Sequence, residues 1–203
     1  MTLLYFVFGT DTHNHLQANF AILSWLAYGK CIDRIVVLTD APDFYRFIDD
    51  DRVVLQATDR QQLDEWEGPH QFFWRVKIKA IEDVAARYPD RHVFYQDADT
   101  FCFNDPARLK ASLDAGRNLM HAREGALSEL PTSTERKMWK QCQGKSFGGV
   151  TINADHNMWN AGVVAISASK IPQVVSKALA ICDDMCAAGV TRRLIEQFAL
   201  SVA

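Results

Sequence analysis

Two carboxylates, Asp97 and Asp99, follow directly after an apolar run at residues 92–95. The run predicts a buried strand, and residues two apart in an extended chain point the same way, so both carboxylates can address one site. Two neighbouring carboxylates repel each other unless a cation compensates them. Because hard oxygen ligands favour Mg²⁺, Mn²⁺ or Ca²⁺, the pair is a candidate divalent-metal site. A solvated turn with two ordinary aspartates is the alternative.

Lys77 is a second candidate, on a helix predicted over residues 72–88. It lies within or beside the apolar face of that helix, four residues after Phe73 and three before Ala80. A lysine in this position either extends its ammonium group past the apolar surface or pairs with an anion. A diphosphate at the edge of a sheet is one such anion, and simple extension into solvent is equally open.

Two later segments carry polar groups suited to a sugar. Asn160 can both donate hydrogen bonds to hydroxyl groups and accept them, and Gly162 permits close approach of the backbone. A tight turn leading into a strand is the simpler interpretation of this segment. Glu196 and Gln197 lie on the last predicted helix, where Glu196 can equally be an exposed carboxylate.

The elements that must position these residues alternate between short apolar runs and helical patterns, which is typical of a parallel α/β sheet. Strands are predicted at residues 3–8, 34–38, 52–55, 92–95 and 162–166, and helices at residues 14–28, 59–67, 72–88, 171–188 and 192–203. Ligands of open α/β sheets bind beyond the carboxyl ends of the strands, and Asp97 and Asp99 stand at such an end.

Two segments need separate comment. The helix at residues 14–28 is predicted from an apolar helical spacing, which consists of Leu16, Phe20, Leu23 and Ala27. Residues 123–157 are polar and glycine-containing, with a short helix predicted at 135–142. Loops of this length are uncommon in compact domains and tend to be functional, so we expect contacts to an acceptor from this stretch.

Composition narrows the class of protein. The chain has 203 residues, enough for one α/β domain, of which 48% are hydrophobic and 23% charged. The net charge of −3 and the lack of a basic run argue against a nucleic-acid binder. The apolar run at the N-terminus is too short for a signal peptide or a transmembrane segment. Five scattered cysteines indicate free thiols and favour a reducing, cytoplasmic location.

Taken in order, the segments resemble glycosyltransferase family 8 and the wider glycogenin-like group. The matching segments cover nearly the whole chain and comprise residues 8–11, Lys77, residues 94–100, residues 159–163 and residues 196–197. The resemblance implies a GT-A fold, in which a mixed, mainly parallel sheet is flanked by helices. It also implies a single nucleotide-sugar-binding domain over residues 1–203.

The same resemblance implies a metal-dependent, retaining glycosyltransferase of the hexosyltransferase type. Such enzymes move a sugar from a nucleotide-sugar, often a UDP-sugar, to a saccharide or other hydroxyl acceptor. Asp97 and Asp99 would hold Mn²⁺ or Mg²⁺, with Asp99 the more direct ligand. Lys77 would approach the phosphates or the donor sugar, and Gln96 would belong to the same donor site.

By the same resemblance, the end of the first strand would line the nucleobase and ribose with Phe8, Gly9, Thr10 and Asp11. Asp40, after the second strand, would also reach the base. Four later residues would surround the transferred sugar, namely Asn160, Gly162, Glu196 and Gln197. Glu196 or Gln197 is the candidate for the face of the sugar opposite the leaving group. A glutamate there can act as a nucleophile or a stabilising charge, whereas a glutamine can only orient or stabilise.

The sequence departs from the family pattern in two respects. The family usually carries a late histidine as a third metal ligand, and none of the six histidines matches it, so we expect that the C-terminal part of the domain is absent. The family also usually has Asp-Gln where this chain has Glu196 and Gln197. A catalytically inactive, nucleotide-sugar-binding relative is therefore an alternative. A sugar-phosphate nucleotidyltransferase is disfavoured, since residues 9–13 contain one glycine and no basic residue.

Overall fold

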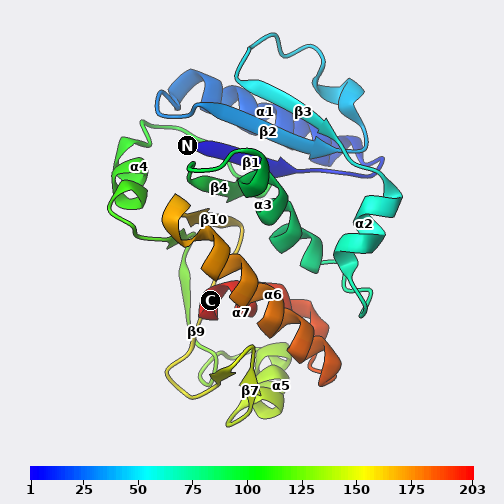
Figure 1. The fold of residues 1–203 in the computed structure, drawn as a ribbon, viewed down its shortest axis with the longest axis vertical. Helices are drawn as coiled ribbons and strands as arrows, with labels where there is room; N and C mark the ends of the chain where they lie inside the picture. Colours follow the sequence, from blue (N-terminus) through cyan, green and yellow to red (C-terminus); the bar gives the residue numbers. More distant parts are fainter. The chain divides into compact units, whose positions relative to one another are not determined.

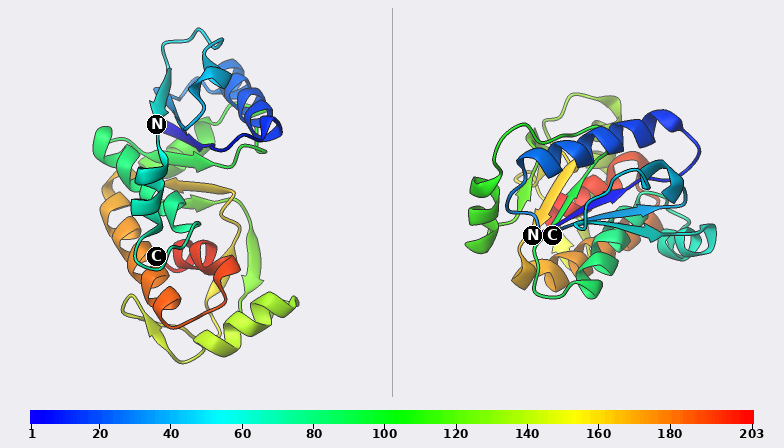
Figure 2. Two further views of the ribbon diagram at one scale, coloured as in Figure 1. Left: turned by 90° about the vertical axis from the view of Figure 1, so that its right-hand side faces the viewer. Right: turned by 90° about the horizontal axis from the view of Figure 1, so that it is seen from above.

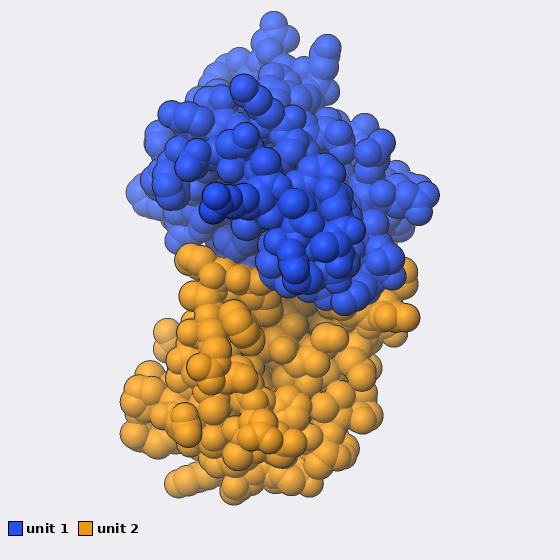
Figure 3. Space-filling view, turned by 90° about the vertical axis from the view of Figure 1, so that its left-hand side faces the viewer, with its two compact units in different colours: residues 1–62, 80–119, 162–171 blue, residues 63–79, 120–161, 172–203 orange.

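The computed structural model describes all residues from 1 to 203, and these form two compact units (Figure 3). Unit 1 consists of residues 1–62, 80–119 and 162–171. Unit 2 consists of residues 63–79, 120–161 and 172–203. Both units are therefore assembled from segments that lie far apart in the sequence.

Unit 1 is built on a six-stranded sheet with the strand order β3-β2-β1-β4-β10-β5. Its strands are β1 (Thr2–Phe6), β2 (Arg34–Thr39), β3 (Val53–Ala57), β4 (Val93–Gln96), β5 (Leu119–Met120) and β10 (Val163–Ile166). β1 pairs in parallel with β2 and β4, and β2 with β3, whereas β10 runs antiparallel to β4. The prediction of a mixed, mainly parallel sheet is confirmed.

The strand order places a reversal point beside β1, which lies between β2 and β4. α1 (Thr12–Tyr28), which links β1 to β2, covers one face of the sheet, and the later turns of α3 (Arg75–Arg87), which precede β4, cover the other (Figures 1 and 2). Right-handed crossovers that leave in opposite directions produce this arrangement. The carboxyl ends of β1 and β4 therefore border the position at which open α/β sheets bind their ligands.

The helix α1 was predicted at nearly its observed bounds, but its apolar spacing is not its buried face. Leu16, Phe20 and Leu23 are 58%, 60% and 46% exposed. The buried residues of α1 lie on another side of the helix and are His15, Ala18, Asn19, Ala21, Ile22 and Trp25. The buried face therefore combines Ile22 and Trp25 with small and polar side chains, while Leu16, Phe20 and Leu23 lie largely in solvent.

Unit 2 contains two small sheets and three helices. β6 (Arg123–Ala126) pairs antiparallel with β9 (Asn157–Trp159), and β7 (Ser146–Phe147) pairs with β8 (Val150–Thr151). The helices are α5 (Ser133–Cys142), α6 (Ile171–Ala187) and α7 (Ile195–Val202), of which α7 packs against β9. The long helix predicted at residues 171–188 is thus confirmed.

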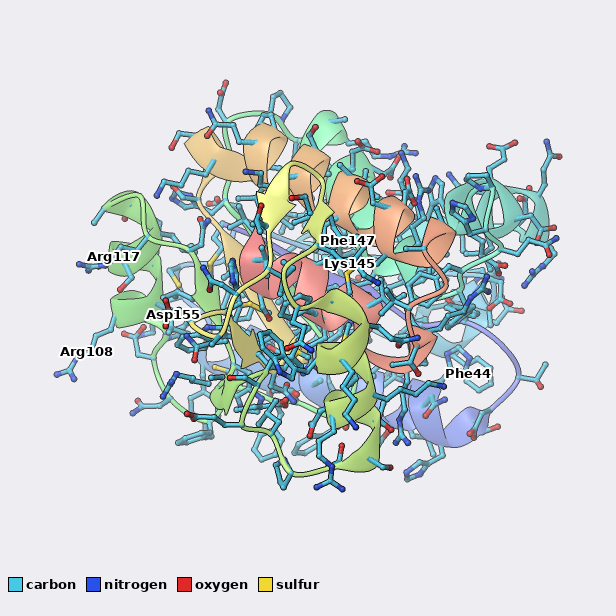
Figure 4. All side chains as sticks on the ribbon, turned by 90° about the horizontal axis from the view of Figure 1, so that it is seen from below. Phe44, Arg108, Arg117, Lys145, Phe147 and Asp155 are labelled. Carbon is cyan, nitrogen blue, oxygen red and sulfur yellow. The ribbon has the colours of Figure 1, made fainter.

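The expectation of a long loop over residues 123–157 is wrong, because this stretch forms four short strands and α5. α5 begins with a capping box, in which Thr132 and Glu135 each satisfy the other's backbone N–H. Phe147 on β7 is buried, whereas Lys145 just before it is exposed (Figure 4). Strands of two to four residues are too short to leave a period-2 pattern in the sequence, which explains the error.

The remaining elements connect this framework. They are α2 (Arg60–Glu67), α4 (Ala107–Asp114) and the 3₁₀ turns η1 (Pro42–Tyr45), η2 (Ala168–Lys170) and η3 (Arg192–Leu194). None of the helices has both the length and the apolar character that crossing a membrane requires.

Candidate functional site

The loop at the end of β1 is held by two contacts to one glycine. The Gly9 N–H donates to the carboxylate of Asp40, at 2.9 Å from Oδ1 and 3.1 Å from Oδ2. The Gly9 carbonyl accepts from Nε2 of His15 at 2.8 Å. Gly9 has a φ of +89°, a left-handed value that disfavours a side chain even though a Cβ there would meet no atom within 4 Å. Asp40 therefore supports the loop that the sequence assigns to the nucleobase.

His15 is fully buried, and its partners determine its tautomer. A carbonyl can only accept, so Nε2 carries a hydrogen toward Gly9. Nδ1 lies 2.8 Å from the hydroxyl of Tyr45. Burial, and then the nearby charge of Asp40, raise the pKa of Tyr45 well above its usual range, so the phenol stays protonated and can donate to Nδ1. The chain Tyr45–His15–Gly9 thus links α1 and η1 to the β1 loop.

Other residues of this loop are more open to solvent. Phe8 is half-buried, and Thr10 and Asp11 are exposed. Asp11 is the N-cap of α1, and its Oδ1 accepts the backbone N–H of His13 at 3.0 Å. One oxygen of Asp11 is therefore engaged in starting the helix, a common role for an aspartate in this position.

The two aspartates after β4 stand in different surroundings. Asp97 is half-buried, its N–H donates to the carbonyl of Gly162 at 2.8 Å, and its Oδ1 accepts from the hydroxyl of Tyr95 at 2.6 Å. Asp99 is exposed, and its Oδ1 accepts from the hydroxyl of Thr100 at 3.4 Å. The backbone contact to Gly162 continues the pairing of β4 with β10. Gly162, itself a predicted site residue, therefore helps to set the position of Asp97.

Gln96 lies between this segment and the core. Its Nε2 donates to the Tyr5 hydroxyl at 3.0 Å and to the Thr100 carbonyl, while its Oε1 accepts from Nε1 of Trp25 at 3.0 Å. Gln96 is buried, so these bonds satisfy an amide that would otherwise be costly to bury. Through Thr100, Gln96 shapes the turn that carries Asp97 and Asp99.

The chemistry of these side chains fits a hard divalent cation. Asp97 and Asp99 supply carboxylate oxygens, and the chain has no cluster of three or more histidine, cysteine or acidic side chains that could hold a metal by itself. Mg²⁺ commonly binds through one or two carboxylates and completes its shell with water and substrate phosphates. A pair of aspartates is thus compatible with Mg²⁺ or Mn²⁺ bound together with a diphosphate.

A pocket of about 260 Å³ adjoins Asp99 in unit 1. It is lined by α1 and by the turn after β4, through His13, Leu16, Gln17, Phe20, Ala98, Asp99 and Phe101. The rings of Phe20 and Phe101 meet edge to face, with centroids 5.3 Å apart. Two of the apolar residues that were used to predict α1, Leu16 and Phe20, therefore belong to the wall of this pocket.

In unit 2, Lys77 pairs with Glu196. Its Nζ lies 3.2 Å from Glu196 Oε1 and donates to the carbonyl of Ala161 at 3.2 Å. The side chains of Lys77 and Glu196 are only 11% and 9% exposed. The sequence predicted that Lys77 needs either solvent or an anion, and within the chain that anion is Glu196.

Asn160 and Gln197 also meet in unit 2, through a residue that the sequence did not single out. Nδ2 of Asn160 donates to Glu124 Oε1 at 3.1 Å, and Nε2 of Gln197 donates to Glu124 Oε2 at 2.9 Å. Glu124 is one of several carboxylates in a polar stretch, and no spacing distinguishes it. Only the pairing of β6 with β9 and the packing of α7 on β9 bring these residues together.

The site residues predicted from the sequence thus fall into two sets, one in each unit. Unit 1 holds the strand-end residues, which are Phe8, Gly9, Thr10, Asp11, Asp40, Gln96, Asp97, Asp99 and Gly162. Unit 2 holds Lys77, Asn160, Glu196 and Gln197. It also holds Glu124, which the sequence did not predict and which bonds to Asn160 and Gln197.

The strand order, the flanking helices and the polar loops at the carboxyl ends of β1 and β4 define a GT-A fold. Solved glycosyltransferases share it. Mouse xyloside xylosyltransferase 1, in its apo form, matches 98% of this chain and 80% of its own, with 13% identity and a TM-score of 0.61. The galactosyltransferase LgtC in complex with donor and acceptor sugar analogs matches 100% of this chain and 70% of its own, with 11% identity and a TM-score of 0.62.

A structure of an active-site mutant of LgtC gives the same result, with 12% identity, a TM-score of 0.63 and coverage of 100% of this chain and 70% of its own. No protein-family model and no curated protein sequence matches the chain. At these identities the likeness establishes the fold alone.

Proposed function

We propose that this chain is a metal-dependent, retaining glycosyltransferase that uses a nucleotide-sugar, with a UDP-sugar favoured, and transfers the sugar to a hydroxyl acceptor. The observation that carries the proposal is the pair Asp97 and Asp99 at the end of β4, beside the Gly9 loop of β1, in a GT-A fold. The solved proteins that share this fold are a xylosyltransferase and a galactosyltransferase. The resemblance of the sequence to glycosyltransferase family 8 supports the retaining class.

The proposed roles follow from the chemistry of the leaving group. Negative charge grows on a nucleoside diphosphate as its bond to the sugar breaks, and preorganised positive groups stabilise that charge. Mn²⁺ or Mg²⁺, held by Asp97 and Asp99, supplies part of this stabilisation when bound. The loop around Gly9, supported by Asp40 and His15, binds the nucleoside. Lys77 contributes positive charge, and its pairing with Glu196 orients both side chains.

The sugar is assigned to the polar side chains of unit 2, and Gly162 keeps the role that the family resemblance gives it. Asn160 and Gln197 offer amide groups for hydroxyls, and Glu196 or Gln197 faces the anomeric carbon. Gln197 cannot form a stable covalent intermediate and can only orient or stabilise. We propose that residues 1–203 act as one donor-binding domain. The five free cysteines support a reducing, cytoplasmic compartment.

Calorimetry of UDP binding with and without Mn²⁺ tests the proposal. We expect Mn²⁺ to tighten UDP binding by tenfold or more, about 1.4 kcal/mol, in the wild-type protein. Asp99→Asn removes a charged metal ligand and should abolish that gain. Asp49→Asn, at an exposed aspartate of unit 1 outside the site, is the matched control and should keep it. If UDP binds no more tightly with metal than without it, the assignment of Asp97 and Asp99 is wrong.

A donor-binding relative without turnover is the second candidate. It is favoured by the lack of a third acidic, histidine or cysteine ligand near Asp97 and Asp99. Hydrolysis of UDP-sugars and GDP-sugars by the folded protein separates the two candidates. Release of free sugar supports the transferase, whereas metal-dependent UDP binding without any release supports the inactive relative.

A further inference from the structure

Glu124 on β6 connects two amide side chains that come from different elements of unit 2. Its Oε1 accepts from Asn160, which follows β9, and its Oε2 accepts from Gln197 on α7. The donor–acceptor distances are 3.1 and 2.9 Å. Each carboxylate oxygen thus serves one amide, although Glu124 is an exposed residue.

This arrangement determines how both amides are turned. A carboxylate only accepts hydrogen bonds, so Asn160 and Gln197 must direct their NH₂ groups toward Glu124. Their carbonyl oxygens then point elsewhere. Asn160 Oδ1 lies 3.3 Å from Nδ1 of His121, while Gln197 Oε1 accepts no hydrogen bond in the structure. Donation of N–H to a charged acceptor also polarises an amide and strengthens its carbonyl as an acceptor.

We infer that Glu124 is a positioning residue that determines sugar specificity, because it holds one N–H of Asn160 and one N–H of Gln197 and so fixes how their carbonyl oxygens are presented to the donor sugar. The inference rests on the proposed function and deepens it. A sugar hydroxyl that meets one of these carbonyl oxygens must direct its hydrogen at it. A substituent that cannot donate, such as fluorine, meets an unpaired oxygen, and sites built to bond a hydroxyl reject such analogues strongly.

The other acidic residue of this region does not share this role. The Glu196 carboxylate is paired with Lys77 in a nearly buried position, whereas Glu124 has no lysine or arginine partner. The net charge of Glu124 is therefore balanced only by the two amide dipoles. Loss of that charge should change the hydrogen-bond pattern of Asn160 and Gln197 without breaking an ion pair.

Glu124→Gln tests the inference because it conserves shape and supplies one oxygen and one NH₂ group. Only one of the two amides can then keep its orientation, and the other must turn its carbonyl inward. Glu129→Gln, at an exposed carboxylate of the same segment, is the matched control. Both variants are compared with the wild-type protein in binding Mn²⁺–UDP and a series of Mn²⁺–UDP-sugars with each sugar hydroxyl replaced in turn by fluorine.

In the wild-type protein and in Glu129→Gln, we expect fluorine at one or two positions to weaken binding by about tenfold. In Glu124→Gln, the loss at those positions should fall to about threefold or less, while UDP itself binds as in the wild type. If fluorine weakens binding equally in Glu124→Gln and in the wild type, the inference is overturned. It is also overturned if Glu124→Gln weakens the binding of UDP and of all UDP-sugars equally, because that result indicates a structural role alone.

NMR of the side-chain amides tests the same arrangement without any ligand. We expect the NH₂ signals of both Asn160 and Gln197 to shift in Glu124→Gln and to stay unchanged in Glu129→Gln. If neither signal moves, Glu124 does not hold the amides and the inference is wrong. If the signals move but the wild-type protein binds no nucleotide-sugar with metal, the proposed function fails instead and the specificity role fails with it.

Discussion

In unit 1, the main chain is held at two strand ends. The N–H and carbonyl of Gly9 bond to the side chains of Asp40 and His15, and the N–H of Asp97 donates to the Gly162 carbonyl. In unit 2, Lys77 is set by the side chain of Glu196, and two amides are set by the side chain of Glu124. Of these bonds, the one between Asp97 and Gly162 continues the pairing of β4 with β10. The contacts of unit 2 join side chains that are distant in the sequence. Glu124 and Asn160 are 36 positions apart, and Lys77 and Glu196 are 119 positions apart.

The difference shows where each set is vulnerable. A backbone-to-backbone contact such as that of Asp97 with Gly162 survives most substitutions, because the main chain is present whatever the side chain is. Contacts between two side chains disappear when either partner is truncated, and a buried charge left behind is costly. We therefore expect the residues of unit 2 to be the more sensitive to single substitutions.

The largest effect is expected for Lys77→Ala, which leaves Glu196 nearly buried and without its ion-pair partner. Breaking a buried pair by removing one member costs about 3–5 kcal/mol in the free energy of unfolding. Urea denaturation measures this loss. Lys177→Ala, at an exposed lysine of α6, is the control and should change stability by less than about 0.5 kcal/mol.

A second substitution sharpens this prediction. Lys77→Met combined with Glu196→Gln removes both charges and should recover most of the lost stability, since neutral replacements avoid the uncompensated charge. If Lys77→Ala unfolds within about 1 kcal/mol of the wild type, the ion pair is weaker than its burial implies.

For unit 1, His15→Phe is expected to have an intermediate effect. Phenylalanine retains stacking on Phe44, whose ring lies 4.2 Å from that of His15, but leaves the Gly9 carbonyl and the Tyr45 hydroxyl unpaired. Loss of a partner for a buried polar group costs about 1–3 kcal/mol. Thermal and urea unfolding measure the loss, and Tyr45→Phe, which removes one of the two bonds, should cost less. An equal loss in both variants would contradict the role given to the Gly9 contact.

Ser201→Ala should have a smaller effect, of about 1 kcal/mol. The Ser201 hydroxyl donates to the Gln197 carbonyl at 2.7 Å and accepts the Trp159 N–H at 3.0 Å, so it ties α7 to β9. Alanine leaves one backbone N–H without this acceptor. Amide hydrogen exchange at Trp159 measures the result and should become faster, whereas exchange in β4 of unit 1 should not change. Faster exchange in both places would indicate global destabilisation.

The smallest effect is a pH dependence at the edge of unit 1. Hydrogen bonds from the side chain and then the backbone N–H of Arg52 lower the pKa of Asp50 from 3.8 to about 2. A lowered pKa in the folded state stabilises the protein above pH 3.8, and this contribution is lost as the pH falls through about 2. The pair is partly exposed, so the contribution should be well under about 1 kcal/mol. The difference in unfolding free energy between wild type and Asp50→Asn at pH 5 and pH 2 measures it, and no change in that difference contradicts the prediction.

The sheet was predictable because its strands leave local patterns. β1, β2 and β4 are buried along most of their length and appear in the sequence as uninterrupted apolar runs. Asp97 and Asp99 follow one of these runs directly, so their place at a strand end needed no long-range information. The short strands of unit 2 leave no comparable pattern, and the stretch that contains them was wrongly expected to be a loop.

The helix α1 shows a limit of periodicity. Leu16, Phe20 and Leu23 share one helical face, which correctly indicated a helix. They do not identify the buried face, because burial depends on how the helix lies on the sheet. The buried face instead includes His15 and Asn19, whose polar groups bond to Gly9 and to the Phe44 carbonyl. A polar residue on a buried face is recognised only when its partner is known.

The sequence by itself determined all strands of the sheet except β5, the long helices and the aspartate pair at the end of β4, because these features depend on neighbouring residues and on periods of two or 3.6. Tertiary structure alone decided that Glu196 is the partner of Lys77 and that Glu124 joins Asn160 to Gln197. Those contacts arise when β6, β9, α7 and the first turn of α3 come together, and residues so distant in the chain carry no local signal of their pairing.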